Sequence, residues 1–146
     1  MPGADPRTVP AYRAWAERHG SQAAAFAGEA AWSPERRFGR VFERLALPGL
    51  GRTARFELLV ALGAADVCPV AADALHFGKE DDATAVAAKR LLVSGDRMLL
   101  ERRAAELARA CGVRLGALDR ALAVWGQGQA PSEDAPEAIR SALGLR

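Results

Sequence analysis

Apolar residues recur along this chain at the three- and four-residue spacings that place side chains on one face of a helix. Several of these stripes begin at a helix-capping serine or aspartate or at an early proline. No segment shows the period-two alternation of a half-buried strand. The pattern predicts an all-α fold, a compact multi-helix domain with helices over about 9–18, 21–32, 33–46, 52–62, 82–92, 97–111 and 115–125.

The length and composition predict one domain. The chain has 146 residues, of which 50% are hydrophobic, enough for a substantial core. Residues 1–8 contain small and polar residues and prolines, and we expect them to be disordered. We expect a helical domain over 9–129, followed by a linker and a short last helix within 130–146, the helix at about 137–143.

The most distinctive stretch is residues 47–63, LPGLGRTARFELLVALG. Pro48-Gly49-Leu50-Gly51 predicts a tight turn, because glycine adopts backbone angles closed to other residues. Apolar stripes at helical spacing lie on both sides of the turn, and Gly63 is expected to end the second one. Residues 36–63 therefore predict a helix, a glycine-containing hairpin and a second helix.

This arrangement is a candidate anion site. The backbone N–H groups of the hairpin lie at the start of the second helix, where the helix dipole favours negative charge. Arginines cluster around it, and a phosphate backbone would relieve their repulsion from that helix end. The alternative is an ordinary loop between core helices with solvated arginines. The arginines in question are Arg36, Arg37, Arg40, Arg44, Arg52 and Arg55.

The charge distribution adds to this picture more than the net charge does, which is only +2. Residues 33–57 and 97–120 each hold six arginines and three acidic residues, whereas residues 64–96 hold six acidic and three basic residues. The two basic segments predict one basic face if they fold together. The bias to arginine over lysine is also consistent with coding composition alone.

The segment LPGLGRTA resembles the helix-hairpin-helix signature of the DNA glycosylase superfamily that includes endonuclease III and the alkyladenine glycosylases. The resemblance covers roughly residues 35–126 and marks a short, diverged member; the superfamily also has members similar to proteins of phage-type hypermodified-base pathways. It implies non-specific contact with the DNA phosphate backbone and a monovalent cation at the hairpin, with no other cofactor. The implied DNA-binding residues are Gly49, Leu50, Gly51, Arg52, Thr53, Arg55, Arg36, Arg37 and Arg40.

The resemblance also implies a catalytic carboxylate. The short apolar segment after the second helix carries Asp73 at the matching position, where a glycosylase would stabilise positive charge on the sugar. The alternative is that Asp73 caps a helix containing Leu75, His76 and Phe77. Thr53 occupies the position of the lyase lysine, so any excision enzyme of this type would be monofunctional.

The resemblance does not extend to the usual size of these enzymes. Only about 45 residues precede the hairpin, too few for the helical domain that completes the base pocket. Tyr12, Trp15 and Trp32 are candidates to lie near an extruded base, although aromatic residues at helical spacing are commonly core residues. A homodimer is one way to complete the pocket. We therefore favour a DNA-binding module; a monofunctional glycosylase and a helical protein-interaction scaffold are the alternatives.

Cysteine usage and hydropathy indicate the compartment. Cys68 and Cys111 lie in apolar helical context, are expected to be free thiols and lack metal-ligand spacing, so no metal site is predicted. The chain has no apolar run long enough to span a bilayer and no signal-peptide pattern. We expect a cytoplasmic protein without a membrane partner.

Overall fold

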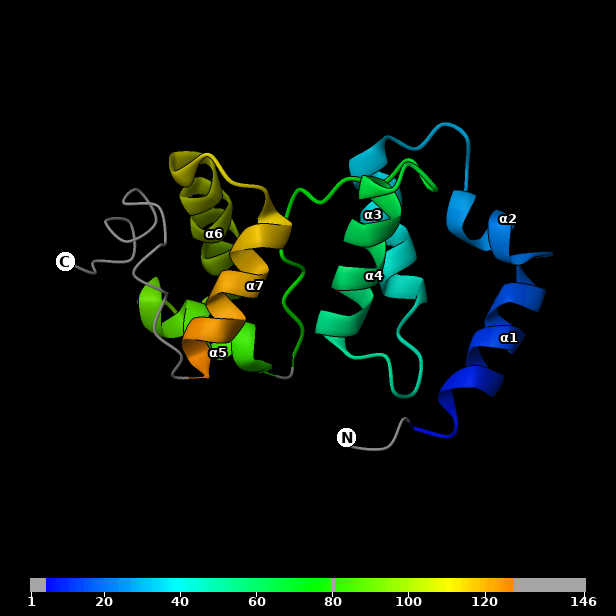
Figure 1. The fold of residues 1–146 in the computed structure, drawn as a ribbon, viewed down its shortest axis with the longest axis horizontal. Coiled ribbons are helices and arrows are strands. Elements are labelled where there is room, and N and C mark those ends of the chain that lie inside the picture. The colour runs from blue at the N-terminus through cyan, green and yellow to red at the C-terminus, as the bar shows by residue number, and fades with distance from the viewer. Residues whose placement is uncertain (1–4, 80, 128–146) are drawn as a thin grey trace. The chain divides into compact units, whose positions relative to one another are not determined.

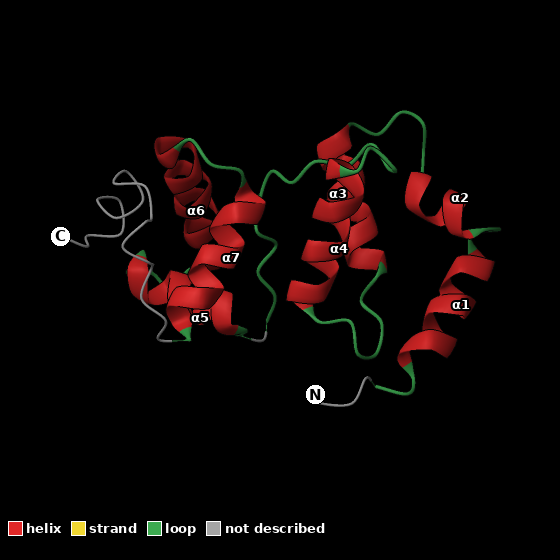
Figure 2. Cartoon of the chain, in the orientation of Figure 1, coloured by secondary structure: helices red, strands yellow, loops and turns green. Residues whose placement is uncertain are grey.

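The computed structural model describes residues 5–79 and 81–127, and within them the predicted all-α class is confirmed (Figure 1). Seven helices and no strand occur in the described part of the chain, as Figure 2 shows by colour. The chain divides into two compact units, residues 1–72 and 73–146, which we describe separately. The helical domain expected over 9–129 spans parts of both units.

The first unit contains four helices: α1 (Thr8–Arg18), α2 (Gln22–Ala27), α3 (Pro34–Arg44) and α4 (Arg52–Ala64). Ser21 and Ser33 cap α2 and α3 as predicted, each hydroxyl accepting a hydrogen bond from a first-turn N–H group. Aromatic rings hold these helices together: Trp15 meets Phe26 edge-to-face at 5.2 Å, and Phe38 meets Phe56 at 5.6 Å. Its core is therefore aromatic.

The second unit contains α5 (Ala83–Leu91), α6 (Arg97–Cys111) and α7 (Leu115–Gly126), which pack against one another. Asp82 and Asp96 cap α5 and α6, as their positions in the sequence predict. Alanines and a glycine allow close approach: a Cβ atom added at Gly126 would lie 2.9 Å from the carbonyl oxygen of Ala83. This core is therefore built from small residues and leucines.

The second predicted helix is shorter than expected. α2 ends at Ala27 because Gly28 has a φ of 59°, in the left-handed region. Trp32, which we expected on this helix, lies in the loop before α3 and is buried. A Cβ atom at position 28 would lie 2.2 Å from the Trp32 ring, so only glycine fits there.

Gly63 does not end α4, contrary to our prediction, since that helix continues to Ala64. A Cβ atom at position 63 would lie 2.5 Å from the carbonyl oxygen of Val70. The glycine therefore permits the chain that leaves α4 to return closely against the helix.

The helix expected at Leu75–Phe77 is absent: this segment is irregular, and Asp73 is not a helix cap. Its backbone is bound elsewhere, because the N–H groups of Leu75 and Phe77 donate to the Glu101 carboxylate at 2.9 and 2.6 Å. His76 between them has a φ of 55°, which interrupts helical geometry. Glu101 therefore holds this segment on α6, although a charged residue in a helical pattern usually indicates a solvated face.

The two ends of the chain are described only in part. Residues 1–4 lie outside the described residues, as do the predicted linker at 130–136 and helix at 137–143. In the part of 1–8 that is described, Asp5 pairs with Arg7 and Thr8 opens α1. The Thr8 hydroxyl donates to the carbonyl oxygen of Pro48 at 2.7 Å, so these residues are ordered against the 45–51 turn.

Candidate nucleic-acid interface

The turn at residues 45–51 joins α3 to α4 through a defined backbone path. The N–H group of Leu50 donates to the carbonyl oxygen of Leu47 at 3.0 Å. Gly49 has a φ of 78°, and a Cβ atom there would lie 2.0 Å from the Thr8 hydroxyl. The turn therefore needs glycine at position 49 for two reasons, backbone angle and space.

Gly51 is the N-cap of α4, and no side chain caps this helix. The helices α2, α3, α5 and α6 use Ser21, Ser33, Asp82 or Asp96 as the acceptor, whereas α1 and α7, like α4, have no side-chain cap. Gly51 has extended backbone angles, and a Cβ atom added to it would meet no atom within 4 Å. The beginning of α4 is therefore open on the Gly51 side and carries the partial positive charge of a helix N-terminus.

A row of exposed arginines lies on the neighbouring helix. Arg36, Arg40 and Arg44 follow one another at four-residue spacing on α3 and share its outer face. Arg40 lies 3.8 Å from the Glu43 carboxylate in a solvent-exposed pair, and the Arg44 guanidinium lies 5.1 Å from the centre of the Trp32 ring. These side chains keep their charges at the surface, where a polyanion has access to them.

Arg37, predicted to contact DNA, is instead part of the interior. Its side chain is 7% exposed. The guanidinium donates to three backbone carbonyl oxygens, those of Ala27 at 2.7 Å, Pro69 at 2.9 Å and Glu29 at 3.2 Å. It ties the loop after α2 and the segment after α4 to α3, so we remove it from the candidate interface.

Arg52 and Arg55 also turn toward the protein. Arg52 is 6% exposed, with its guanidinium 5.6 Å from the centre of the Phe56 ring and 3.3 Å from the hydroxyl of Thr53. Arg55 is half-buried and donates to the carbonyl oxygen of Phe42 at 2.9 Å. Burial, and then the charge of Arg52, lower the pKa of Arg55. The two arginines brace the turn, and their charges contribute to its field.

Asp73, the predicted catalytic carboxylate, does not belong to the same compact unit as the 45–51 turn. It is the first residue of the second unit, whereas the 45–51 turn belongs to the first. Its side chain is 60% exposed, and its Oδ1 atom lies 3.8 Å from Nε2 of His76. The structure thus groups Asp73 with His76.

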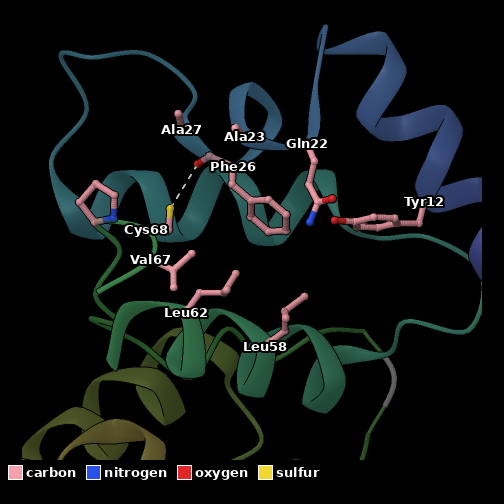
Figure 3. Close-up of a pocket in the computed structure, with 10 residues that line it drawn as sticks. Tyr12, Gln22, Ala23, Phe26, Ala27, Leu58, Leu62, Val67 and Cys68 are labelled. Atoms are coloured by element: carbon pink, nitrogen blue, oxygen red, sulfur yellow. Dashed lines mark hydrogen bonds between the residues drawn. The ribbon is translucent and has the colours of Figure 1, made fainter. Parts of the chain in front are cut away.

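The three aromatic residues predicted to lie near a base differ in their exposure and position. Trp15 and Trp32 are buried, at 1% and 7% exposure. Tyr12 instead lines a cavity of about 760 Å³ within the first unit. Figure 3 shows this cavity between side chains of α2, such as Phe26, and side chains of α4, such as Leu62. We did not predict it, because its walls come from segments far apart in the sequence.

Both cysteines are free thiols, as predicted. Cys68 is buried, and its thiol lies 3.6 Å from the carbonyl oxygen of Phe26 (Figure 3). Burial raises the pKa of this thiol, and the charge of Arg37 partly offsets the rise. Among the described residues no group of three or more His, Cys, Asp and Glu side chains is placed to hold a metal ion. None of the described helices is both long and apolar enough to cross a bilayer.

These features define an all-helical protein whose first unit contains a helix N-terminus without a side-chain cap and, on the preceding helix, a row of exposed arginines. Over residues 4–135 the chain matches the family described as alpha-glutamyl/putrescinyl thymine pyrophosphorylase clade 3, and it belongs to that family. No curated protein and no solved structure matches the chain. The family's description concerns modified thymine, and the resemblance to DNA glycosylases stays a prediction.

Proposed function

We propose that this protein binds the phosphate backbone of DNA through the beginning of α4 and the outer face of α3, and that it acts in the modification of thymine bases. Binding through phosphates is independent of base sequence and strongly dependent on salt. The protein is then a DNA-binding member of a base-modifying family.

One observation carries the proposal: the N-terminus of α4 is capped by Gly51 without a side-chain acceptor, on the side where added atoms would meet nothing. A phosphate oxygen at this position would accept hydrogen bonds from first-turn N–H groups and interact favourably with the helix dipole. Arg36 and Arg40 supply exposed positive charge on the preceding helix. Both features favour the binding of negatively charged phosphate groups.

The family's description supports the second half of the proposal. It names thymine carrying glutamyl or putrescinyl groups and a pyrophosphorylase, an enzyme whose reaction forms or consumes pyrophosphate. Thymine is a base of DNA, so a protein that acts on it within the polymer needs a phosphate-binding surface. Base excision by Asp73 and a scaffold role stay the alternative predictions.

The test is fluorescence anisotropy of a labelled duplex at a series of salt concentrations. The double variant Arg36→Gln/Arg40→Gln should weaken binding to all sequences alike and reduce the salt slope by about 2, because each arginine would neutralise one phosphate. The matched control is Arg13→Gln/Arg18→Gln, which removes two exposed arginines of α1 in the same unit. That control should leave the slope within about 0.5 of the wild type.

Equal reductions in the two double variants would mean general charge attraction and would contradict the assigned surface. Absence of binding even at low salt would remove the DNA proposal and leave the scaffold alternative. An assay for abasic sites, run in parallel with Asp73→Asn, separates the excision alternative. Base release that disappears in Asp73→Asn would establish a glycosylase.

A further inference from the structure

The cavity of the first unit has the size of a small-molecule site. Its volume of about 760 Å³ lies in the range of ligand pockets, which is roughly 300–1,000 Å³. It is formed by α1, α2, α4 and the segment 67–69. In Figure 3, Leu58 and Leu62 point from α4 toward Phe26 and Gln22 on α2, and Tyr12 lies beside Gln22.

The lining of the cavity selects against charged ligands. None of the ten described residues that line it carries a charged side chain. Moving an ion from water into such a space without a counter-charge is strongly unfavourable. Free putrescine, a dication, and glutamate, an anion at neutral pH, are therefore poor occupants of this cavity.

The polar groups of the lining converge at one end. In Figure 3 the Gln22 side chain lies beside the Tyr12 hydroxyl, and burial raises the pKa of that hydroxyl. A glutamine amide has both donor and acceptor atoms and matches the alternating donor and acceptor edge of a cyclic imide. The rings of Tyr12 and Phe26 provide aromatic surface for a planar ring, and apolar side chains form the opposite wall.

We propose that this cavity binds an uncharged pyrimidine base of the thymine type, with Gln22 and Tyr12 at its imide edge and the side chains of Phe26, Leu58 and Leu62 around its faces and methyl group. The inference rests on the proposed function, since the family's description supplies thymine as the base. α4 contributes to both proposed sites. Its N-terminus belongs to the phosphate-binding surface, and its later turns line the cavity.

The experiment uses free thymidine, which has no phosphate and therefore tests the cavity apart from the DNA-binding surface. Thymidine is titrated into the full-length ¹⁵N-labelled protein and followed by amide chemical shifts. Shifts should concentrate in α1, α2, the second half of α4 and residues 67–69. Gln22→Leu should weaken binding about fivefold, the effect of removing one neutral hydrogen-bonding group. The matched control Gln127→Leu changes an exposed glutamine of the second unit and should leave binding unchanged.

A second measurement uses DNA itself. A thymine oligonucleotide should bind roughly tenfold more tightly than an abasic oligonucleotide of the same length, and Tyr12→Phe/Gln22→Leu should reduce that ratio without changing affinity for the abasic strand. Equal affinity for the two strands, with no shifts from thymidine at millimolar concentration, would overturn the cavity assignment and leave the phosphate surface intact. Equal binding of adenosine, or shifts of the same residues by putrescine or glutamate, would overturn the ligand class. Thymidine shifts without DNA binding would support the cavity and contradict the phosphate surface.

Discussion

The guanidinium of Arg55 donates a hydrogen bond from Nη1 to the carbonyl oxygen of Phe42 at 2.9 Å and lies 4.2 Å from the centre of the Phe42 ring. Its Nε atom also donates to the carbonyl oxygen of Gly51 at 3.4 Å. One side chain of α4 thus connects the end of α3 to the turn that follows it. The arginine that the sequence places in a DNA interface holds the two helices of that interface together.

Replacing Arg55 should therefore affect stability first. Arg55→Ala removes a charge-assisted hydrogen bond to Phe42 and the cation–π interaction, and we expect a decrease of about 2 kcal/mol in the free energy of unfolding. Urea denaturation measures this decrease. Arg40→Ala removes an exposed arginine of the same interface and should change stability by less than about 0.5 kcal/mol. A stable Arg55→Ala protein with weakened DNA binding would instead make Arg55 a direct phosphate ligand.

Gly63 provides a test of the packing between the end of α4 and the segment around Val70. In Gly63→Ala the new Cβ atom would lie 2.5 Å from the Val70 carbonyl oxygen, so backbone must move. We expect a destabilisation of about 1–3 kcal/mol, larger than the gain of about 1 kcal/mol that alanine brings to a helix interior. Gly95→Ala is the control, because its Cβ atom meets nothing within 4 Å. A Gly63→Ala protein more stable than wild type would show that the two segments are not this close in solution.

Local signals account for the parts of this fold that the sequence predicts. Ser21, Ser33, Asp82 and Asp96 cap the helices that their positions indicate, because a cap depends on residues only three positions away. The stripes before and after the 45–51 turn likewise give α3 and α4, with α4 extending two residues beyond the expected end.

Interactions between distant residues decide what the sequence does not predict. Glu101 determines the path of the segment around Leu75 from 26 positions away, and Arg37 binds the Pro69 carbonyl from 32 positions away. Both residues are charged and lie on helices, so the pattern alone assigns them to solvent or to a ligand. The cavity is missed for the same reason, since it forms only where α1, α2 and α4 meet the segment after α4. Helical spacing does separate Arg37 from its exposed neighbour Arg36, because Arg37 lies four and eight residues before the buried Val41 and Leu45.

The two thiols should differ in reactivity. Burial raises the pKa of Cys68, and its thiol faces the Phe26 carbonyl, whereas Cys111 is half-buried. Since the thiolate is the nucleophile, Cys111→Ser protein should react with iodoacetamide at pH 8 at least about tenfold more slowly than Cys68→Ser protein. Equal rates would contradict the burial of Cys68.

The raised pKa of Cys68 also determines how stability should depend on pH. The contribution of this thiol to stability is complete below the unfolded-state pKa, about 8.5, and is lost as pH rises through the folded-state pKa. Cys68→Ala should therefore reduce the decline of stability as pH rises above about 8.5.

Substitution of Gly51 separates stability from binding. In Gly51→Asp the carboxylate would accept first-turn N–H hydrogen bonds of α4 and interact with the helix dipole, in space where a Cβ atom meets no neighbour. We expect the free energy of unfolding to rise by about 0.5–1 kcal/mol. The same carboxylate would occupy the proposed phosphate position and repel the backbone, so DNA affinity should fall by at least about tenfold at low salt.

Gly51→Asp is expected to raise stability and lower DNA affinity. Gly95→Asp is the matched control, because it adds the same charge at an exposed glycine just before the N-cap of α6. It should lower DNA affinity only slightly. Gly51→Asn keeps the capping amide oxygen without the charge, and we expect it to fall between wild type and Gly51→Asp in binding. Urea denaturation and anisotropy on the same samples give both quantities. If Gly51→Asp stabilises the protein and binds DNA as wild type does, the N-terminus of α4 is capped normally and the phosphate lies elsewhere. If it destabilises the protein, the beginning of α4 is not open as the Gly51 geometry indicates.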